Sequence, residues 1–230
     1  MLLPKVHKDD KCEFVKLLKS IYGLKQAGKL WFENIGGVLF SNSYTQCPCD
    51  QCVFTKFIPS ENIDIDVCLY VDDLLVSGTT HGATDLLWQQ LKLAYGDVNE
   101  TTGTKTHLGK NWERLQHGLK IGQPGYIQKI ITDLDMTDCD IATTPYRNNK
   151  RKFSKIYLTH TPALTEKFRS IVGLLNHAAT HTRPDILFAT SFLATRMTEA
   201  NQSDIEDGLH IVKYLKGTPF LGFTFTNDIE

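Results

Sequence analysis

The sequence predicts an α+β fold, with an antiparallel sheet and flanking helices in residues 1–122 and a mostly helical region in residues 123–230. The sheet is indicated by residues 63–71, whose side chains alternate between apolar and polar as in a half-buried strand. A short apolar run, Leu74–Val76, follows and predicts the second strand of a hairpin. The helical region is indicated by three segments beyond residue 162, in which apolar side chains recur at helical spacing.

The composition is that of an ordinary globular protein. Of the 230 residues, 41% are hydrophobic and 22% are charged, and the formal net charge is −1. This charge does not mark a nucleic-acid binder, so any such binding has to come from a local basic patch. No apolar run reaches the roughly 18 residues of a membrane span, and the first residues are too poor in apolar side chains for a signal peptide. We therefore expect an intracellular protein whose six cysteines are reduced thiols.

The predicted hairpin joins its strands at two adjacent aspartates, Asp72 and Asp73. Tight turns favour Asn-Gly or Gly-containing pairs, so an Asp-Asp turn is an unusual choice. The two carboxylates also repel each other unless a cation lies between them. Such a departure from local rules is typical of functional sites, although an acidic turn in solvent explains the pair equally well.

Further elements are predicted on both sides of this hairpin. Apolar positions predict a helix over residues 26–39, with Lys25 and Gln26 at its start, where amides and cations suit an anionic ligand; a solvated helix start is the alternative. A second amphipathic helix is expected over residues 80–95. Residues 107–115 and 119–121 predict a second hairpin, with its turn at 116–118.

The second half opens with a helix that begins at Pro124. A basic segment follows at residues 147–155 and reads as a linker or as a contact for backbone phosphates. Of the three later helices, the last is announced by a capping box from Ser203 to Glu206 and ends at Gly217. Alternating apolar residues at 221–225 then predict a strand.

Three cysteines lie close together, at Cys47, Cys49 and Cys52. The last two have C-x-x-C spacing, but no second pair of cysteines or histidines follows at the distance typical of a zinc ribbon. The spacing therefore favours a loop with buried thiols over a zinc knuckle.

Two motifs read together resemble copia-type LTR-retrotransposon reverse transcriptases. Residues 20–27 read S-I-Y-G-L-K-Q-A and are similar to the family's S-L-Y-G-L-K-Q-A element, and residues 70–75 match its Y-V-D-D-L-L box. Further family motifs occur in the same order along the chain: Leu108-Gly109, Gln123-x-x-Tyr126-Ile127, Met136-x-x-Cys139, Thr182-Arg183-Pro184-Asp185-Ile186 and Leu215-Lys216-Gly217-Thr218.

The resemblance implies part of a right-hand polymerase. Residues 1–122 would form a partial palm and residues 123–230 a thumb or connection region. The implied reaction is RNA-directed DNA synthesis, in which a primer 3′-hydroxyl attacks a deoxynucleoside triphosphate beside two Mg²⁺ (or Mn²⁺) ions. The implied partners are an RNA template, a DNA primer and the rest of a Pol polyprotein, either in a cytoplasmic virus-like particle or in the nucleus.

The resemblance also implies roles for particular residues. Asp72 and Asp73 would be the catalytic metal ligands, and Lys25 and Gln26 would line the incoming nucleotide. Four residues would lie at the primer: Tyr70, Val71, Leu108 and Gly109. Trp112, next to the last pair, reads better as a packed aromatic than as a stacking platform.

Three parts of the family pattern are expected outside this chain: the fingers, an upstream segment with a further metal-binding aspartate, and the ribonuclease H domain. With only two carboxylates from one hairpin, we expect the chain to be a truncated polymerase with little or no activity. Two alternatives remain: a relic or co-opted fragment that binds nucleic acid without catalysis, and an unrelated metal-dependent phosphatase or nuclease.

Overall fold

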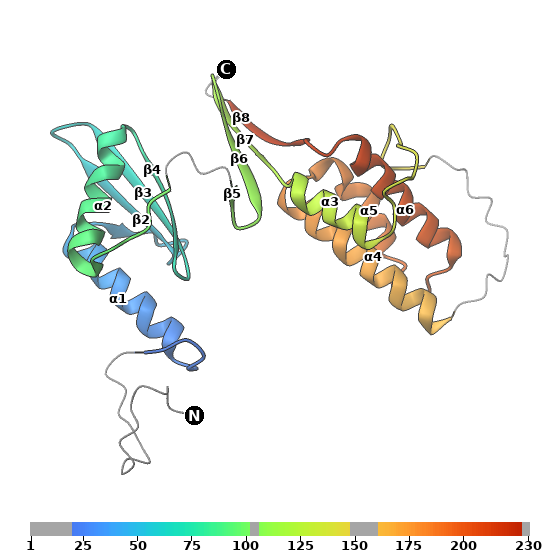
Figure 1. Cartoon of the computed structure of the whole chain (residues 1–230), viewed down its shortest axis with the longest axis horizontal. Coiled ribbons are helices and arrows are strands. Elements are labelled where there is room, and N and C mark those ends of the chain that lie inside the picture. Colours follow the sequence, from blue (N-terminus) through green and yellow to red (C-terminus); the bar gives the residue numbers. More distant parts are fainter. Residues whose placement is uncertain (1–19, 102–105, 148–160, 227–230) are drawn as a thin grey trace, which may run out of the picture. The chain divides into compact units, whose positions relative to one another are not determined.

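The computed structural model describes residues 20–101, 106–147 and 161–226, and the chain divides into two compact units, residues 1–101 and 102–230 (Figure 1). The predicted α+β class is confirmed. Each unit contains an antiparallel four-stranded sheet, and the second unit is mostly helical. The functional boundary at residue 122 stays a prediction. Most of the basic segment at 147–155 lies outside the described residues.

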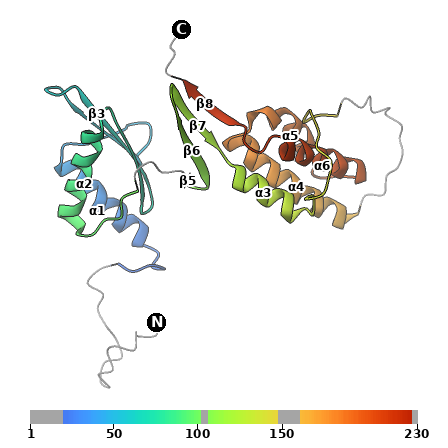
Figure 2. The ribbon, with the colours of Figure 1, turned by 45° about the horizontal axis from the view of Figure 1, so that its top comes forward.

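The first unit is a sheet with two helices on one side, as Figure 2 shows. Its strands lie in the order β1-β2-β3-β4, and every neighbouring pair is antiparallel. The elements in chain order are α1 (Ala27–Ser41), β1 (Thr45–Gln46), β2 (Val53–Ile58), β3 (Ile63–Tyr70), β4 (Asp73–Gly78) and α2 (His81–Tyr95).

Burial alternates along β3, as the sequence predicts. Ile65, Val67 and Leu69 are buried beneath the helices, whereas Asp64 and Asp66 are exposed on the opposite face. The core of this unit is formed by apolar side chains from both helices and the sheet: Ile35, Leu39, Tyr44, Phe54, Ile65, Val67, Leu69, Ala83, Leu87 and Leu91. The helices thus cover one face of the sheet, and the side chains of Asp64 and Asp66 are exposed on the other face.

The second unit combines a helical bundle with a second sheet, whose strand order is β5-β6-β7-β8. Its last strand returns from the far end of the chain to pair with β7. The elements are β5 (Thr106–His107), β6 (Lys110–Leu115), β7 (Gly118–Gly122), α3 (Pro124–Asp133), α4 (Pro162–His181), the 3-10 helix η1 (Pro184–Ile186), α5 (Leu187–Ala194), α6 (Gln202–Gly217) and β8 (Gly222–Thr226).

The bundle core is the larger of the two cores. Apolar side chains of α3, α4, α5 and α6 meet in it, including Ile130, Phe168 and Val212, each with no more than 1% of its surface exposed. The predicted helices at 124, after 162, near 184 and before 217 are all present. Pro124 and Pro162 stand in the first turns of α3 and α4, where a missing N–H costs nothing.

Three local predictions are wrong. The β3–β4 register pairs Tyr70 with Asp73, so the turn residues are Val71 and Asp72, and Asp73 begins β4. The capping box of α6 joins Asn201 and Asp204, because the N-cap is Asn201, two residues before the proposed cap at Ser203.

The third correction concerns residues 107–115, which are not one strand. Leu108 and Gly109 form a tight turn between β5 and β6, with φ angles of 49° and 72°. Strands β1 and β2 had no counterpart in the prediction, although the alternation in Val53–Ile58 is a signal for β2.

Candidate functional site

The two aspartates lie at the tip of the β3–β4 hairpin. Val71, the first turn residue, has a φ of 55°, and no positive φ occurs at Asp72. This is the φ pattern of a type II′ turn, which normally has glycine at its first position. A β-branched residue in this region is strained by about 1–3 kcal/mol, so the surroundings must hold it there.

Two aromatic side chains from α1 and the segment before it hold the tip. The Trp31 indole N–H donates a hydrogen bond to the backbone carbonyl of Val71. The Tyr22 hydroxyl donates to Oδ2 of Asp72 at 2.7 Å. A hydrogen bond from Tyr22 therefore joins the segment at residues 20–27 to the aspartate box, about fifty residues away in the chain.

The tip carries concentrated negative charge. The side chains of Asp72 and Asp73 are both exposed. The hydrogen bond to Asp72, followed by its charge and that of Asp73, raises the pKa of the Tyr22 phenol above its ordinary value. The phenol thus stays a hydrogen-bond donor to Asp72 at neutral pH.

Lys25 and Gln26 lie where the sequence places them, immediately before α1. Both side chains are exposed, and Gln26 is the N-cap residue but makes no capping hydrogen bond with its side chain. Gly23, with a φ of 89°, forms the turn that leads from Tyr22 to this pair. The Lys25 ammonium and the Gln26 amide therefore follow closely in the chain after Tyr22, whose phenol donates to Asp72.

The proposed primer residues fall into two groups. Tyr70 and Val71, each 57% exposed, adjoin the aspartates in the hairpin itself. Leu108 and Gly109 lie in the second unit, and nothing in the structure fixes their distance from the aspartates. Leu108, like Val71, is a non-glycine residue with positive φ at the tip of a tight hairpin. Trp112, beside them, is half-buried.

The donor set at the tip suits a hard divalent cation. Mg²⁺ and Mn²⁺ prefer carboxylate oxygens, and this tip offers two exposed carboxylates. In the described part of the chain, no group of three or more Asp, Glu, His or Cys side chains could hold a metal ion. Such a cation would therefore need further oxygen ligands from water, substrate or residues beyond this set.

Cys47, Cys49 and Cys52 are free thiols, and the prediction that they are buried is wrong, because Cys49 and Cys52 are exposed and Cys47 is only partly buried. Asp50 accepts a hydrogen bond from the Cys52 backbone N–H, so the C-x-x-C segment is an Asx turn. Burial, with the charges of Asp66 and Asp50, raises the pKa of the Cys68 thiol on the neighbouring strand.

One group of motif residues forms a buried network that the sequence reasoning missed. The guanidinium of Arg183, with 1% of its surface exposed, donates two hydrogen bonds to the Asp185 carboxylate at 2.9 and 2.7 Å. It also donates to the carbonyl and hydroxyl oxygens of Thr218 at 2.8 and 2.7 Å. Its neighbour Thr182 donates to Oε1 of buried Gln123 at 2.9 Å. Three of the motifs therefore meet at this one junction of the second unit.

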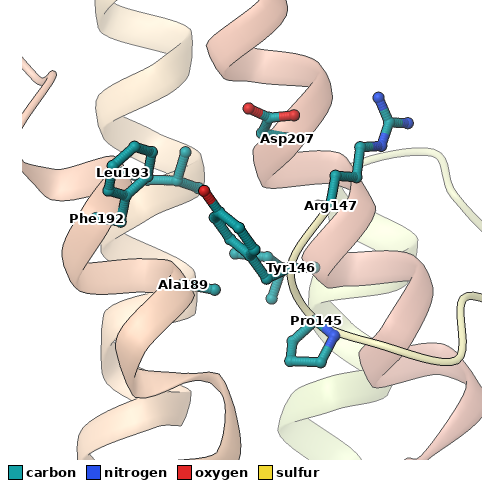
Figure 3. Close-up of a pocket in the computed structure, with 8 residues that line it drawn as sticks. Pro145, Tyr146, Arg147, Ala189, Phe192, Leu193 and Asp207 are labelled. Carbon is teal, nitrogen blue, oxygen red and sulfur yellow. The ribbon is translucent and has the colours of Figure 1, made fainter. Parts of the chain in front are cut away.

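A small pocket lies beside the bundle, where the segment after Asp140 crosses α5 and α6 (Figure 3). Tyr146 lines it and makes edge-to-face contacts with the rings of Phe188 and Phe192. His210 Nε2 lies 3.0 Å from the carbonyl of Thr144 and fixes the same segment to α6. The pocket is therefore a packing contact of this segment and offers no room for a substrate.

Within the described ranges, no helix is both long enough and apolar enough to cross a membrane.

Comparison with known proteins identifies the family. The family model for reverse transcriptase (RNA-dependent DNA polymerase) matches residues 4–148. The chain is 30% identical over 212 residues to a retrovirus-related Pol polyprotein from transposon TNT 1-94 of Nicotiana tabacum, which covers 88% of the chain and 16% of the polyprotein.

Shorter relatives match as well. A putative transposon Ty5-1 protein of Saccharomyces cerevisiae is 28% identical over 88% of the chain and 65% of its own length. An uncharacterized mitochondrial protein of Arabidopsis thaliana is 31% identical over 67% of the chain and 62% of its own length. The chain thus spans less than two thirds of each of these relatives, and no solved structure matches it. The chain belongs to the reverse transcriptase family, and its relatives include Pol polyproteins of copia/Ty1-type retrotransposons.

Proposed function

We propose that this chain forms part of an RNA-directed DNA polymerase, with the first unit as the core of its palm. The observation that carries the proposal is the β3–β4 tip: a strained turn, held by Trp31 and Tyr22, presents two carboxylates beside the open face of a sheet. A reactive constellation needs such a fixed and exposed position. The family match supports the same reading.

In this proposal Asp72 and Asp73 hold the divalent cations, Mg²⁺ or Mn²⁺. When bound, these ions would activate the primer 3′-hydroxyl and neutralise the charge of the leaving pyrophosphate. Tyr70 and Val71 position the primer end next to the carboxylates. The Tyr22 phenol orients the Asp72 carboxylate through its hydrogen bond.

Lys25 and Gln26 contact the deoxynucleoside triphosphate. Their exposure immediately before α1 supports this role, because a cation and unpaired amides at a helix start suit a phosphate group. In the second unit, Leu108 and Gly109 contact the primer strand, and the helices act as the thumb or connection region. RNA template and DNA primer are the macromolecular partners, and the remainder of a Pol polyprotein supplies further polymerase segments.

The decisive experiment is primer extension on an RNA template with Mg²⁺. The 230-residue chain is expected to extend weakly, because two carboxylates leave much of the cation coordination to water and substrate. Asp72→Asn should abolish whatever extension occurs, while Asp64→Asn, on the open face of the same hairpin, should leave it unchanged. Extension that survives Asp72→Asn would falsify the assignment of the site.

The second candidate is nucleic-acid binding without catalysis. It is favoured by the small number of metal ligands at the tip. Among the described residues, no third Asp, Glu, His or Cys side chain joins the two carboxylates. Binding to an RNA–DNA duplex that weakens steeply with salt, without nucleotide incorporation, would select this function. The two candidates differ in the effect of Asp72→Asn, since removal of a negative charge should leave such binding intact or strengthen it.

A further inference from the structure

We propose that His177 and His181 on α4 form a binding site for a divalent transition-metal ion. The two histidines lie one helical turn apart, and both side chains are exposed. Their ring centroids are 4.0 Å apart, with an angle of 31° between the ring planes. Imidazole is the side chain that Zn²⁺, Ni²⁺ and Cu²⁺ share as a preferred ligand.

The spacing of the two residues fits a shared ion. Residues at i and i+4 lie on the same side of a helix, and the centroids of these two exposed rings are 4.0 Å apart. Rotation about the side-chain bonds can therefore place one nitrogen of each ring on the same ion without a change in the helix. Water would fill the remaining positions, because no third metal-ligand side chain of the described residues joins the pair.

A backbone hydrogen bond orients the second ring for this task. Nδ1 of His181 lies 2.8 Å from the carbonyl oxygen of His177, and a carbonyl can only accept. Nδ1 therefore carries the proton, and Nε2 keeps its lone pair for a metal. The hydroxyl of Thr180 donates to the carbonyl of Asn176 at 2.8 Å. The hydroxyl oxygen of Thr180 can therefore also accept from Nδ1 of His181, which lies 3.3 Å away. A second hydrogen bond of this kind is what fixes metal-ligating histidines in proteins.

The first ring is held by a neighbouring helix. Tyr126 of α3 packs its ring edge-to-face against His177, with a centroid distance of 4.6 Å, and its hydroxyl donates to the carbonyl of Leu174. Burial, with the charges of His181 and Lys110, lowers the pKa of His177 below its ordinary value. The His177 ring is therefore fixed beside His181 and lies near a positive charge.

The test is titration of the tag-free, full-length chain with NiCl₂ by calorimetry. Cys47, Cys49 and Cys52 are replaced by serine in all samples, so that thiolates do not compete. One Ni²⁺ should bind per chain, and His177→Ala or His181→Ala should each remove this binding. Matched controls are His117→Ala in the β6–β7 turn and His210→Ala on α6, which should bind as the parent does.

Two further readouts distinguish a metal site from an anion site and from binding to the unfolded chain. Lys110→Gln should tighten Ni²⁺ binding, because it removes a nearby positive charge, whereas binding of an anion would weaken. Ni²⁺ should also raise the Tm of the parent but not of the His177→Ala chain, since only the folded helix brings the two rings together. Binding that both histidine variants retain, or that Asp72→Asn removes, would overturn the proposal. These results do not depend on whether the chain extends a primer.

Discussion

The hairpin tip and the Arg183 junction use family motif residues in opposite ways. At the tip, Asp72 and Asp73 are exposed, and the turn that carries them is strained. At the junction, Arg183 is buried and its guanidinium makes four hydrogen bonds. A motif residue whose bonding capacity is filled inside the fold serves stability, whereas one that keeps its capacity open to solvent is available for a ligand.

The largest expected effect is at the junction. Arg183→Met removes all four hydrogen bonds of the guanidinium to Asp185 and Thr218, and should lower the free energy of unfolding by about 3 kcal/mol. Urea unfolding followed by circular dichroism measures this loss. Arg169→Met is the matched control, because Arg169 is exposed and donates to a single carbonyl, that of Met197. A loss no larger than that of the control would mean that the network is incidental.

The same junction predicts how stability depends on pH. Burial would raise the pKa of Asp185, but the hydrogen bonds and charge of Arg183 lower it below its ordinary value. The pair should therefore contribute fully above about pH 4, the range of an unfolded carboxyl, and lose its contribution as the pH falls through the lower folded value. In Arg183→Met this acid-side loss should shrink, which unfolding curves measured down the acid range can test.

A smaller effect is expected at the second buried contact of the junction. Thr182→Val keeps the shape of the side chain but leaves Oε1 of Gln123 buried without its donor, which should cost about 1–3 kcal/mol. Thr132→Val on α3 is the matched control, because that hydroxyl bonds to a carbonyl at an exposed position. Equal unfolding free energies for the two variants would show that the Gln123 contact contributes nothing.

At the hairpin tip we expect a substitution that raises the free energy of unfolding, in contrast to those at the junction. Val71→Gly removes the strain of a β-branched residue at positive φ, and should raise the free energy of unfolding by about 1 kcal/mol after the entropy cost of glycine. Leu108→Gly tests the corresponding turn of the second unit. A decrease in stability at Val71→Gly would mean that the turn is not strained, and the contrast with the junction would weaken.

The smallest effect concerns ionisation alone. In Asp72→Asn the pKa of Tyr22 should return towards its ordinary value, because its main hydrogen-bond partner loses its charge. Tyrosinate absorbance, compared with a Tyr22→Phe chain to assign the signal, follows the change. Little change in unfolding free energy is expected from either variant, since both groups are exposed. An unaltered Tyr22 titration would place the phenol away from Asp72.

Periodicity predicted most elements because it records which side chains are buried. The alternation at Ile65, Val67 and Leu69 and the helices of the second unit were found in this way. Turn positions were less accessible. The tip register moved by one residue because Val71 occupies a glycine-like conformation that its side chain disfavours, and no propensity rule would place it there.

The candidate site was predicted in part by resemblance, and the contacts that build it came from the structure. Tyr22 lies inside a motif that was recognised, yet its bond to Asp72 spans fifty residues and has no local signature. The same holds for Arg183 and Thr218, thirty-five residues apart.

The pairing of β8 with β7 has a consequence for how the molecule is made. The strands and helices described for the first unit lie between Ala27 and Tyr95, so its core can assemble while the rest of the chain is still being synthesised. The sheet of the second unit is complete only when Gly222–Thr226 pairs with β7, and the hydrogen bonds of Arg183 to Thr218 can form only after Thr218 has been synthesised. On the ribosome, the aspartate hairpin should therefore reach its native form first, and the second unit should remain incomplete until these late residues emerge.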